Sequence, residues 1–390
     1  MDGKEVFNNK YWALNRTMMT LIGLWPYQNR YAKIFIRTFV LLATHSILVF
    51  LVNKTIIEWG KNFAIVCENI AAFFYFKVVI TKYITNCVAE QKLQYLYERI
   101  TEDWNTFNKE DEQRVLARSA SYGRVLTIGY AVFLNICGVG FTLIPTIYPA
   151  LLDIVLPLNH SREKSLCLQV DYFVDHNVHY YKILFHTVGI TFFTVEILSA
   201  IDSTYVNCVQ HIVGLFGLVD LKLDKAFKLT QIKSRSINEQ KKIHNYENTV
   251  ARFVDLLQST YTKFFFMCMA AVLCELSFGT VALMISTVDY VYFMRLLLAW
   301  LGIILYLFYI SIPGQRVTDA SLSISESIFY SGWHEFPLET QKYINFMILR
   351  CSVPCQFTAG PLFVMNIENC GIILKTAMSY CTVVAATNKD

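Results

Sequence analysis

The stretch Ile344–Val384, INFMILRCSVPCQFTAGPLFVMNIENCGIILKTAMSYCTVV, joins a short helix to a final helix that has both polar and apolar faces. Its polar face consists of Lys375, Ser379 and Thr382, three to four positions apart, with Thr387 further along. Met378 and Val383 interrupt this face. A hydrated wall with apolar constrictions is typical of a narrow pore. The stretch therefore predicts a pore-lining membrane helix, and an ordinary helix packed against its neighbours is the alternative.

The composition of the whole chain indicates a membrane protein. The 390 residues are 55% hydrophobic and only 16% charged, whereas a soluble domain carries about a quarter charged residues. The net charge of +4 is small, and the basic residues are scattered between apolar segments. This pattern does not favour a nucleic-acid-binding face.

Seven apolar runs are long enough to cross the hydrocarbon of a bilayer, which takes about 20 helical residues. We therefore expect an all-α membrane protein with seven transmembrane helices, although six or eight remain possible. The runs are Ile34–Val52, Phe63–Thr81, Val125–Leu152, Ile183–Val206, Phe264–Thr287, Val291–Pro313 and Gly360–Ala386. Pro361 stands where such a helix can begin without losing a hydrogen bond.

The orientation follows from the lysines and arginines, because basic residues are retained on the cytoplasmic side. With a cytoplasmic N-terminus, 25 of them lie on the inner side and seven on the outer side. In this count Lys82 belongs to an inner loop and Arg295 to an outer one. We therefore expect the N-terminus to be cytoplasmic and the C-terminus extracellular, opposite to a G-protein-coupled receptor.

The chain divides into four regions on this interpretation. Residues 1–33 form a cytoplasmic segment, 34–312 hold the first six transmembrane helices, 313–359 form a cytoplasmic anchor region, and 360–390 hold the seventh helix with a short outer tail. Apolar residues continue at helical spacing beyond the second and fourth runs, from Leu93 to Trp104 and from Ile212 to Val219. Helices that extend inward in this way predict a cytoplasmic anchor domain.

Neither the cysteines nor the histidines form a recognisable metal or disulfide pattern. Most of the eleven cysteines lie in apolar helices or on the predicted inner side, where thiols stay reduced. Cys351 and Cys355 are one helical turn apart without a second ligand pair, and His176 with His179 suits a solvated loop better than a metal. We expect no metal and no cofactor. Of the three glycosylation sequons, Asn159 in an outer loop is the best candidate.

Ionisable residues inside membrane segments are costly and are functional candidates. The candidates are Glu68, Lys77, Glu196, Asp202, Glu275, Glu368 and Lys375. A structural role is the alternative for each of them: Lys77 can extend toward the inner interface, Asp202 can lie beyond it, and Glu196 and Glu275 can be buried with hydrogen-bond partners.

Two motifs near the C-terminus resemble the seventh segment of insect odorant receptors. In that family a Thr-Ala-Gly step, here Thr358 to Gly360, precedes a helix that ends in a Ser-Tyr or Thr-Tyr pair, here Ser379 and Tyr380. Upstream, IFYSGWHEFP contains Tyr330 and Trp333, which resemble the aromatic pair before the family's short cytoplasmic helix. The chain has neither the Gln-Phe ending of insect gustatory receptors nor the long cytoplasmic insertion of the odorant co-receptor.

The resemblance implies an odorant-tuning subunit that assembles with co-receptor subunits into a heterotetrameric, odorant-gated, non-selective cation channel. Such a protein lies in the plasma membrane of olfactory sensory dendrites, takes part in olfaction and sensory transduction, and binds a small volatile odorant. Alignment on the Ser-Tyr pair places Val383 at the hydrophobic gate, with Ser379, Thr382 and Thr387 along the pore. The resemblance also places the odorant pocket among the second, third, fourth and sixth segments. Its candidate residues are Phe73, Phe76, Phe141, Tyr148, Ile190, Phe193 and Tyr292.

Three other classes of protein remain as alternatives. A G-protein-coupled chemoreceptor also has seven helices, but the chain contains neither an acidic-Arg-aromatic triplet after the third segment nor an Asn-Pro-x-x-Tyr motif. An insect gustatory receptor is the second alternative. A membrane enzyme or transporter would need clustered catalytic groups or a repeat between halves, and the sequence shows neither. We therefore expect no enzyme activity.

Overall fold

The computed structural model describes residues 6–155, 166–230, 236–285, 290–330, 332–335, 338–351, 353–361 and 363–387. These residues form helices with one small hairpin. The helices are η1 (Val6–Asn8), α1 (Ala13–Leu21), α2 (Arg30–Glu58), α3 (Phe63–Val88), α4 (Glu90–Thr106), α5 (Glu110–Val155), α6 (His176–Thr230), α7 (Ser236–Ile285), α8 (Tyr290–Phe329), η3 (Trp333–Glu335), α9 (Leu338–Cys351) and α10 (Ile367–Thr387). The strands are β1 (Thr358–Ala359) and β2 (Phe363–Val364), which pair antiparallel.

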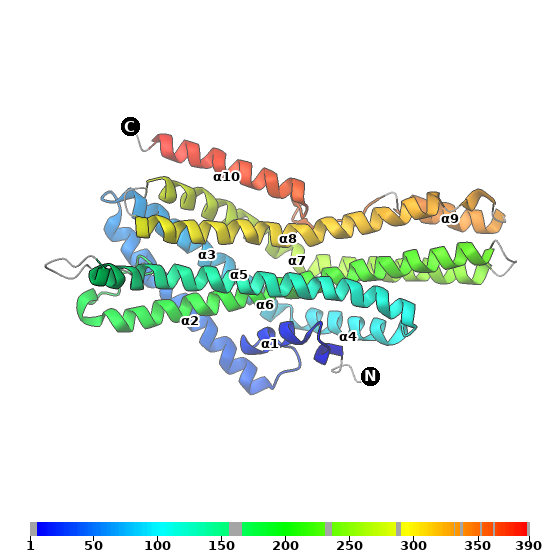
Figure 1. Ribbon diagram of the computed structural model, residues 1–390, viewed down its shortest axis with the longest axis horizontal. Helices are drawn as coiled ribbons and strands as arrows, with labels where there is room; N and C mark the ends of the chain where they lie inside the picture. The colour runs from blue at the N-terminus through cyan, green and yellow to red at the C-terminus, as the bar shows by residue number, and fades with distance from the viewer. Residues whose placement is uncertain are drawn as a thin grey trace.

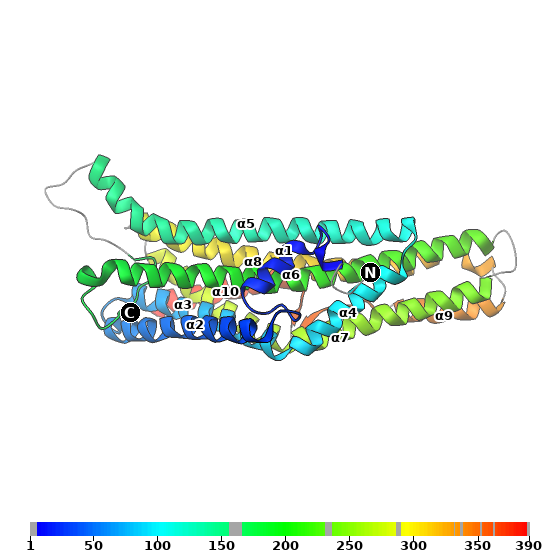
Figure 2. The ribbon, with the colours of Figure 1, turned by 90° about the horizontal axis from the view of Figure 1, so that it is seen from below.

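The longest helices lie along the long axis of the molecule, as Figures 1 and 2 show. Helix α5 packs along α6, α3 packs along α7, and α8 contacts both α5 and α6. Helix α10 lies at the edge of the bundle against α7 and α8 (Figure 1). The short helix α4 contacts the middle of α7, where Lys92 Nζ donates to the Ser259 carbonyl at 3.5 Å, and α9 packs against α7 and α8 near the end at which α7 begins (Figure 2).

Helix α6 is the centre of the bundle, since it packs against α1, α2, α3, α5, α7 and α8. Every residue from Ile197 to Ile212 is buried. A helix that other helices surround on every side carries no solvent-facing polar stripe. This burial confirms that the apolar pattern beyond the fourth run continues the same helix, since α6 extends to Thr230.

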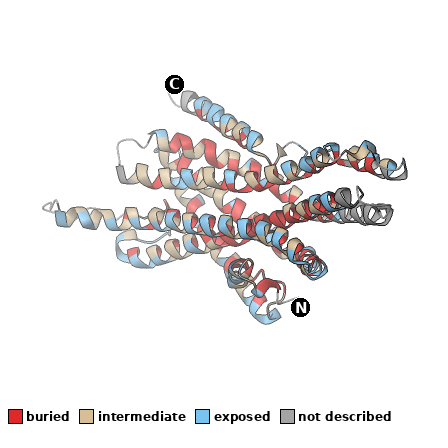
Figure 3. Cartoon of the chain, turned by 45° about the vertical axis from the view of Figure 1, so that its right-hand side comes forward, coloured by how far each residue is buried: buried red, intermediate tan, exposed pale blue. Residues whose placement is uncertain are grey.

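Six helices among the described residues are long and apolar enough to cross a membrane. They are α2, α3, α5, the His176–Lys225 part of α6, the Phe264–Ile285 part of α7 and the Tyr292–Phe329 part of α8. The outer face of α2 exposes large apolar side chains, among them Phe35 at 73% and Leu42 at 68%. Figure 3 shows such exposed residues along the outside of the bundle. The chain is therefore a multi-pass membrane protein, and the seventh crossing by α10 stays a prediction.

Asparagine side chains cap the N-termini of three helices, α2, α3 and α10. The Oδ1 atom of Asn29 accepts from the backbone N–H of Tyr31, and that of Asn62 accepts from Ile65 N–H. At the start of α10, Asn366 Oδ1 accepts from Asn369 N–H at 2.8 Å. Each bond satisfies one of the backbone donors that a helix N-terminus leaves free.

Two predicted helix ends were wrong, and one helix is longer than the apolar run within it. The second run does not continue as one helix, because α3 ends at Val88 and α4 begins at Glu90. Helix α8 continues through Pro313 to Phe329, and a membrane helix tolerates an internal proline where neighbouring helices satisfy the freed backbone group. Helix α10 begins at Ile367, six residues after Pro361, which lies in the turn between β1 and β2.

Two charges that the sequence analysis placed in loops are buried within helices. The Lys82 side chain is fully buried in α3, and the Arg295 side chain is 2% exposed in α8. Each pairs with a carboxylate of another helix, and this pairing offsets the free-energy cost of removing the charge from water. Lys82 was counted on the inner side and Arg295 on the outer side. Removing both from the count leaves the excess of lysine and arginine on the inner side, which predicts the orientation.

Candidate functional site

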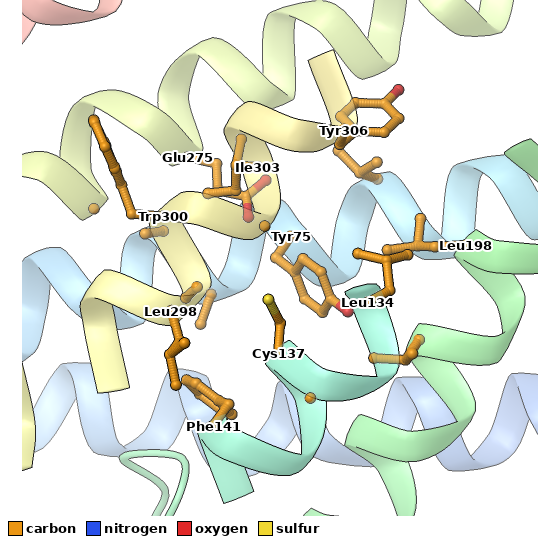
Figure 4. A pocket seen from close by; sticks show the side chains of 18 of the residues that line it. Tyr75, Leu134, Cys137, Phe141, Leu198, Glu275, Leu298, Trp300, Ile303 and Tyr306 are labelled. Atoms are coloured by element: carbon orange, nitrogen blue, oxygen red, sulfur yellow. The ribbon is translucent and has the colours of Figure 1, made fainter. Parts of the chain in front are cut away.

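A cavity of about 170 Å³ lies inside the bundle, at the level where α3, α5, α6, α7 and α8 come together. Figure 4 shows its walls at close range. The lining residues are Glu68, Ala71, Ala72, Tyr75, Phe76, Val78, Lys82, Tyr130, Leu134, Cys137, Gly138, Phe141, Leu168, Thr191, Val195, Leu198, Val272, Glu275, Gly279, Leu296, Leu298, Ala299, Trp300, Gly302, Ile303 and Tyr306. Because most of these side chains are apolar or aromatic with a few polar groups between them, the cavity suits a small apolar molecule.

The positive charge of Lys82, which lines the cavity, is neutralised by the Asp202 carboxylate of α6. Its ammonium lies 2.6 Å from Asp202 Oδ1 and 4.0 Å from the centre of the Tyr306 ring. The second carboxylate oxygen of Asp202 accepts a hydrogen bond of 2.9 Å from the Tyr130 hydroxyl. Four helices, α3, α5, α6 and α8, thus meet at this one ion pair.

A second ion pair closes the opposite part of the cavity. The Arg295 guanidinium of α8 lies 2.7 Å from Glu68 Oε1 of α3. The same guanidinium donates to the backbone carbonyls of Leu166, at 3.2 Å, and Cys167, at 2.9 Å. The next residue, Leu168, lines the cavity. Arg295 therefore holds the segment before α6 against this end of the cavity.

Two hydrogen-bond donors of the cavity wall, Tyr75 and Trp300, have partners inside the protein. The Tyr75 hydroxyl donates to Thr194 Oγ1 at 3.1 Å, and Trp300 Nε1 donates to Thr280 Oγ1 at 3.1 Å. Glu275 of α7 differs, because no described residue donates a hydrogen bond to its carboxyl although its side chain lines the cavity and it is only 6% exposed. Burying a carboxyl without a partner is costly.

Two of the seven expected ligand-contacting residues line the cavity, namely Phe76 and Phe141. Phe73 and Ile190 do not line it, although they pack in the apolar cluster around Ile47 and Leu51 to which Phe76 and Phe141 also belong. The Phe193 ring lies 5.5 Å from that of Phe39, outside the cavity lining.

The remaining two expected residues also lie outside the cavity lining. Tyr148 is half-buried on α5. Tyr292 packs in a third apolar cluster, with its ring 4.7 Å from the Arg295 guanidinium. The four segments expected to form the pocket all contribute to the lining, and α7 contributes as well.

Four aromatic residues that line the cavity were not among the predicted ligand-contacting residues: Tyr75, Tyr130, Trp300 and Tyr306. Aromatic residues are frequent in every membrane helix of this chain, so their identity alone does not say which of them face inward. Glu275 and Glu68 were available as signals, because both are ionisable residues within apolar runs.

Comparison with known proteins identifies the fold and the family. The family model described as 7tm Odorant receptor matches residues 62–378. The chain belongs to the insect odorant receptor family. Odorant receptor 30a of Drosophila melanogaster is 26% identical over 142 residues, which are 35% of this chain and 36% of that protein. This match therefore spans about a third of the relative's length.

Two solved structures share the fold of this odorant receptor. The olfactory receptor OR5 from the insect Machilis hrabei, in complex with eugenol, matches with a TM-score of 0.79 and 14% identity, covering 97% of this chain and all of that one. The structure of OR5 reported without mention of a ligand matches with a TM-score of 0.76 and 15% identity, covering 98% and 99%. Family and fold point to a receptor rather than an enzyme.

Three of the predicted pore residues of the receptor lie on the face of α10 that points away from the bundle. Ser379, Thr382 and Val383 are exposed, Val383 at 59%. On the opposite face, Cys381 is buried and its thiol contacts Met284 of α7 at 3.5 Å. Thr387 is the last residue of α10.

The Thr-Ala-Gly step forms the β-hairpin that precedes α10. Thr358 Oγ1 accepts from Gln258 Nε2 at 3.2 Å, and Gly360 N–H donates to the Thr262 carbonyl at 3.2 Å. Gly360 has φ of +63°, and a Cβ there would lie 2.7 Å from the Phe266 ring. Glycine is needed at this position for both reasons, so the step fixes the start of α10 on α7.

The other motif residues lie at the surface of the single chain. Tyr330 is 83% exposed, Trp333 is half-buried in η3, and Tyr380 is 53% exposed on α10. The glycosylation candidate Asn159 lies outside the described residues.

Proposed function

We propose that this odorant receptor is the ligand-binding, tuning subunit of a heteromeric odorant-gated cation channel. The observation that carries the proposal is the mostly apolar cavity among α3, α5, α6, α7 and α8. A volatile ligand has little polar surface, so its transfer from water into such a cavity is favourable. The OR5 receptor of the same fold was solved in complex with eugenol.

The exposed face of α10 supports a pore between subunits. Exposed apolar residues such as Val383 and Met378 alternate there with small hydroxyl side chains. In the proposed tetramer with co-receptor subunits, Ser379, Thr382 and Thr387 line the pore and Val383 forms its apolar gate, which excludes water when closed.

The proposed mechanism is a shift between closed and open arrangements. An odorant that binds the open arrangement better raises the open population, and a differential affinity of about 1.4 kcal/mol changes the equilibrium tenfold. Two ion pairs on the cavity wall, Lys82 with Asp202 and Glu68 with Arg295, join the helices whose relative positions the ligand would influence.

The proposed orientation places residues 1–33 and the anchor region 313–359 in the cytoplasm. The C-terminus of α10 then lies on the extracellular side of the membrane. That membrane is the plasma membrane of an olfactory neuron. The unequal distribution of lysine and arginine supports this orientation.

The experiment is whole-cell recording from cells that express this chain with and without the insect odorant co-receptor, while a panel of odorants is applied and G-protein signalling is blocked. We expect an odorant-evoked cation current that needs both chains and survives the block. A second-messenger response from this chain alone, without a current, would instead support a G-protein-coupled chemoreceptor.

A further inference from the structure

We propose that Glu275 binds the hydroxyl group of the ligand, so that the receptor selects small alcohols with a hydrocarbon body. This inference rests on the proposed function, since it names the ligand class for the same cavity. Glu275 stands on α7, near the middle of the Phe264–Ile285 apolar segment, and is 6% exposed. Figure 4 shows its carboxyl beside Ile303, with Tyr75 below it at the centre of the view.

Each of the other charged groups of the cavity has an oppositely charged partner in the protein, and the one oxygen without a hydrogen bond among the described residues, Glu68 Oε2, is enclosed by protein atoms. Lys82 pairs with Asp202 at 2.6 Å, and Glu68 pairs with Arg295 at 2.7 Å. Among the described residues, none forms an ion pair with Glu275. A ligand therefore gains little by approaching the two existing pairs, whereas Glu275 offers an unused hydrogen-bonding group.

The neutral donors near Glu275 are committed as well. Tyr75 donates to Thr194, Tyr130 to Asp202 and Trp300 to Thr280. The Tyr306 hydroxyl has no hydrogen-bond partner among the described residues, but protein atoms enclose it and it points away from Glu275 in Figure 4. The partner of the Glu275 carboxyl must therefore come from the contents of the cavity.

The chemistry of a carboxyl in an apolar wall selects the hydroxyl group. A hydroxyl both donates and accepts a hydrogen bond, so it pairs with the carboxyl in either protonation state. An ether oxygen accepts only, and an ammonium group donates only. Most of the rest of the wall is apolar, so a second polar group on the ligand would mostly face apolar side chains and be buried without a partner. The ligand class that fits is a hydrocarbon with one hydroxyl.

The test uses matched ligands that share one hydrocarbon body: benzyl alcohol, benzyl methyl ether, benzylamine and ethylbenzene, and the corresponding n-hexyl compounds. Each is applied to cells that express the receptor with the co-receptor. For the wild-type receptor we expect the half-maximal concentration of the alcohol to be about tenfold lower than that of the methyl ether, which corresponds to about 1.4 kcal/mol. This comparison needs no variant.

The variants test whether the preference for the alcohol comes from the Glu275 carboxyl or from the shape of the cavity. Glu275→Met removes the hydrogen-bonding group at similar volume and should bring the alcohol and ether within about threefold of each other, with the ethylbenzene response kept, because only the net hydrogen bond is lost. Glu275→Gln keeps a donor and an acceptor and should keep the alcohol preference. Glu196→Met is the matched control, since Glu196 is a carboxyl of a membrane helix that does not line the cavity.

Three results would overturn the inference, and each differs from failure of the proposed function. One is equal sensitivity of the wild-type receptor to alcohol and ether, and another is an alcohol preference that persists in Glu275→Met. The third is a preference for the amine that is lost in Glu275→Gln, which would assign a cationic ligand to the carboxyl. The absence of any ligand-evoked current with the co-receptor would refute the channel function itself.

Discussion

The Lys82 ammonium and the Asp202 carboxylate lie 2.6 Å apart at the centre of the helix bundle, and their side chains are 0% and 2% exposed. They join α3 to α6 across a separation of 120 residues. Because the Lys82 ammonium also lies over the Tyr306 ring and Asp202 accepts from Tyr130, the pair fixes the helices that carry the cavity.

Removal of one member of this pair is expected to destabilise the receptor. Asp202→Leu leaves the buried ammonium without its carboxylate, and breaking a buried pair in this way costs about 3–5 kcal/mol. The double change Lys82→Met with Asp202→Leu removes both charges and should cost less than Asp202→Leu alone. The measurement is the thermal stability of the detergent-solubilised protein, together with its amount at the cell surface. A double variant that is less stable than the single variant would contradict this account.

Arg295 is expected to slow the exit of ligand from the cavity. Arg295→Met removes the donors to the Leu166 and Cys167 carbonyls and the cation beside Glu68, so the segment that carries Leu168 loses its attachment to α8. The odorant-evoked current should then decay several times faster after washout. Lys182→Met, which removes an exposed lysine of α6, is the control. Equal decay rates in Arg295→Met and wild type would show that this attachment does not limit exit.

The membrane helices were predictable from the sequence, whereas their pairwise contacts were not. The run Val125–Leu152 lies within α5 and the run Ile183–Val206 within α6, because a predominantly apolar segment of this length can satisfy its backbone in a bilayer only as a helix. The buried state of Lys82 was not predictable, since its position near the end of an apolar run is equally typical of a lysine at the membrane interface. Only the packing of α6 beside α3 supplies its partner.

The site was predictable at the level of helices and much less at the level of residues. Phe76 and Phe141 line the cavity, whereas Phe73 does not, although it lies on the same helix and in the same apolar cluster as Phe76. A helix that is apolar all round carries no periodic signal for its inward face. Pro361 was predicted at a helix start but lies in the hairpin turn, because proline suits both positions.

The cluster of Lys33, Arg37 and Glu90 predicts how stability depends on acidity. Burial of the Glu90 carboxyl disfavours its charged form, but hydrogen bonds from Lys33 and Arg37 outweigh this effect and lower the pKa of Glu90. The unfolded chain therefore binds its proton at higher pH than the folded chain, and the stabilisation is present above the ordinary glutamate pKa and is lost as the pH falls through the folded value.

We expect the unfolding temperature of the solubilised receptor to fall between about pH 6 and pH 3. The fall should be smaller in Glu90→Gln, which has no carboxyl to protonate at this position. Glu98→Gln changes an exposed carboxyl of the same helix α4 and should leave the pH profile as in wild type. Identical profiles for Glu90→Gln and wild type would rule out the contribution of Glu90.

Gly314 permits the close contact between α8 and the start of α10. A Cβ at this position would lie 1.9 Å from the backbone carbonyl oxygen of Met365, which cannot move aside as a side chain can. Gly314→Ala is therefore expected to cost about 1–3 kcal/mol, as overpacking does, and to lower surface expression. Gly129→Ala places its Cβ in open space on α5 and is the matched control. Normal stability of Gly314→Ala would mean that α10 shifts without penalty.

Val383 is expected to set the basal conductance of the channel. It is 59% exposed on the face of α10 that points away from α7 and α8, where the proposed pore lies. Val383→Thr keeps the shape of the side chain and adds a hydroxyl, so water remains longer in an apolar constriction and the closed state leaks. Whole-cell recording without odorant should show a larger resting current for Val383→Thr than for wild type at equal surface expression. Ile372→Thr is the control, because Ile372 is also exposed on α10 but lies three turns nearer the start of the helix. If resting current and ion selectivity are both unchanged in Val383→Thr, the gate lies at another residue.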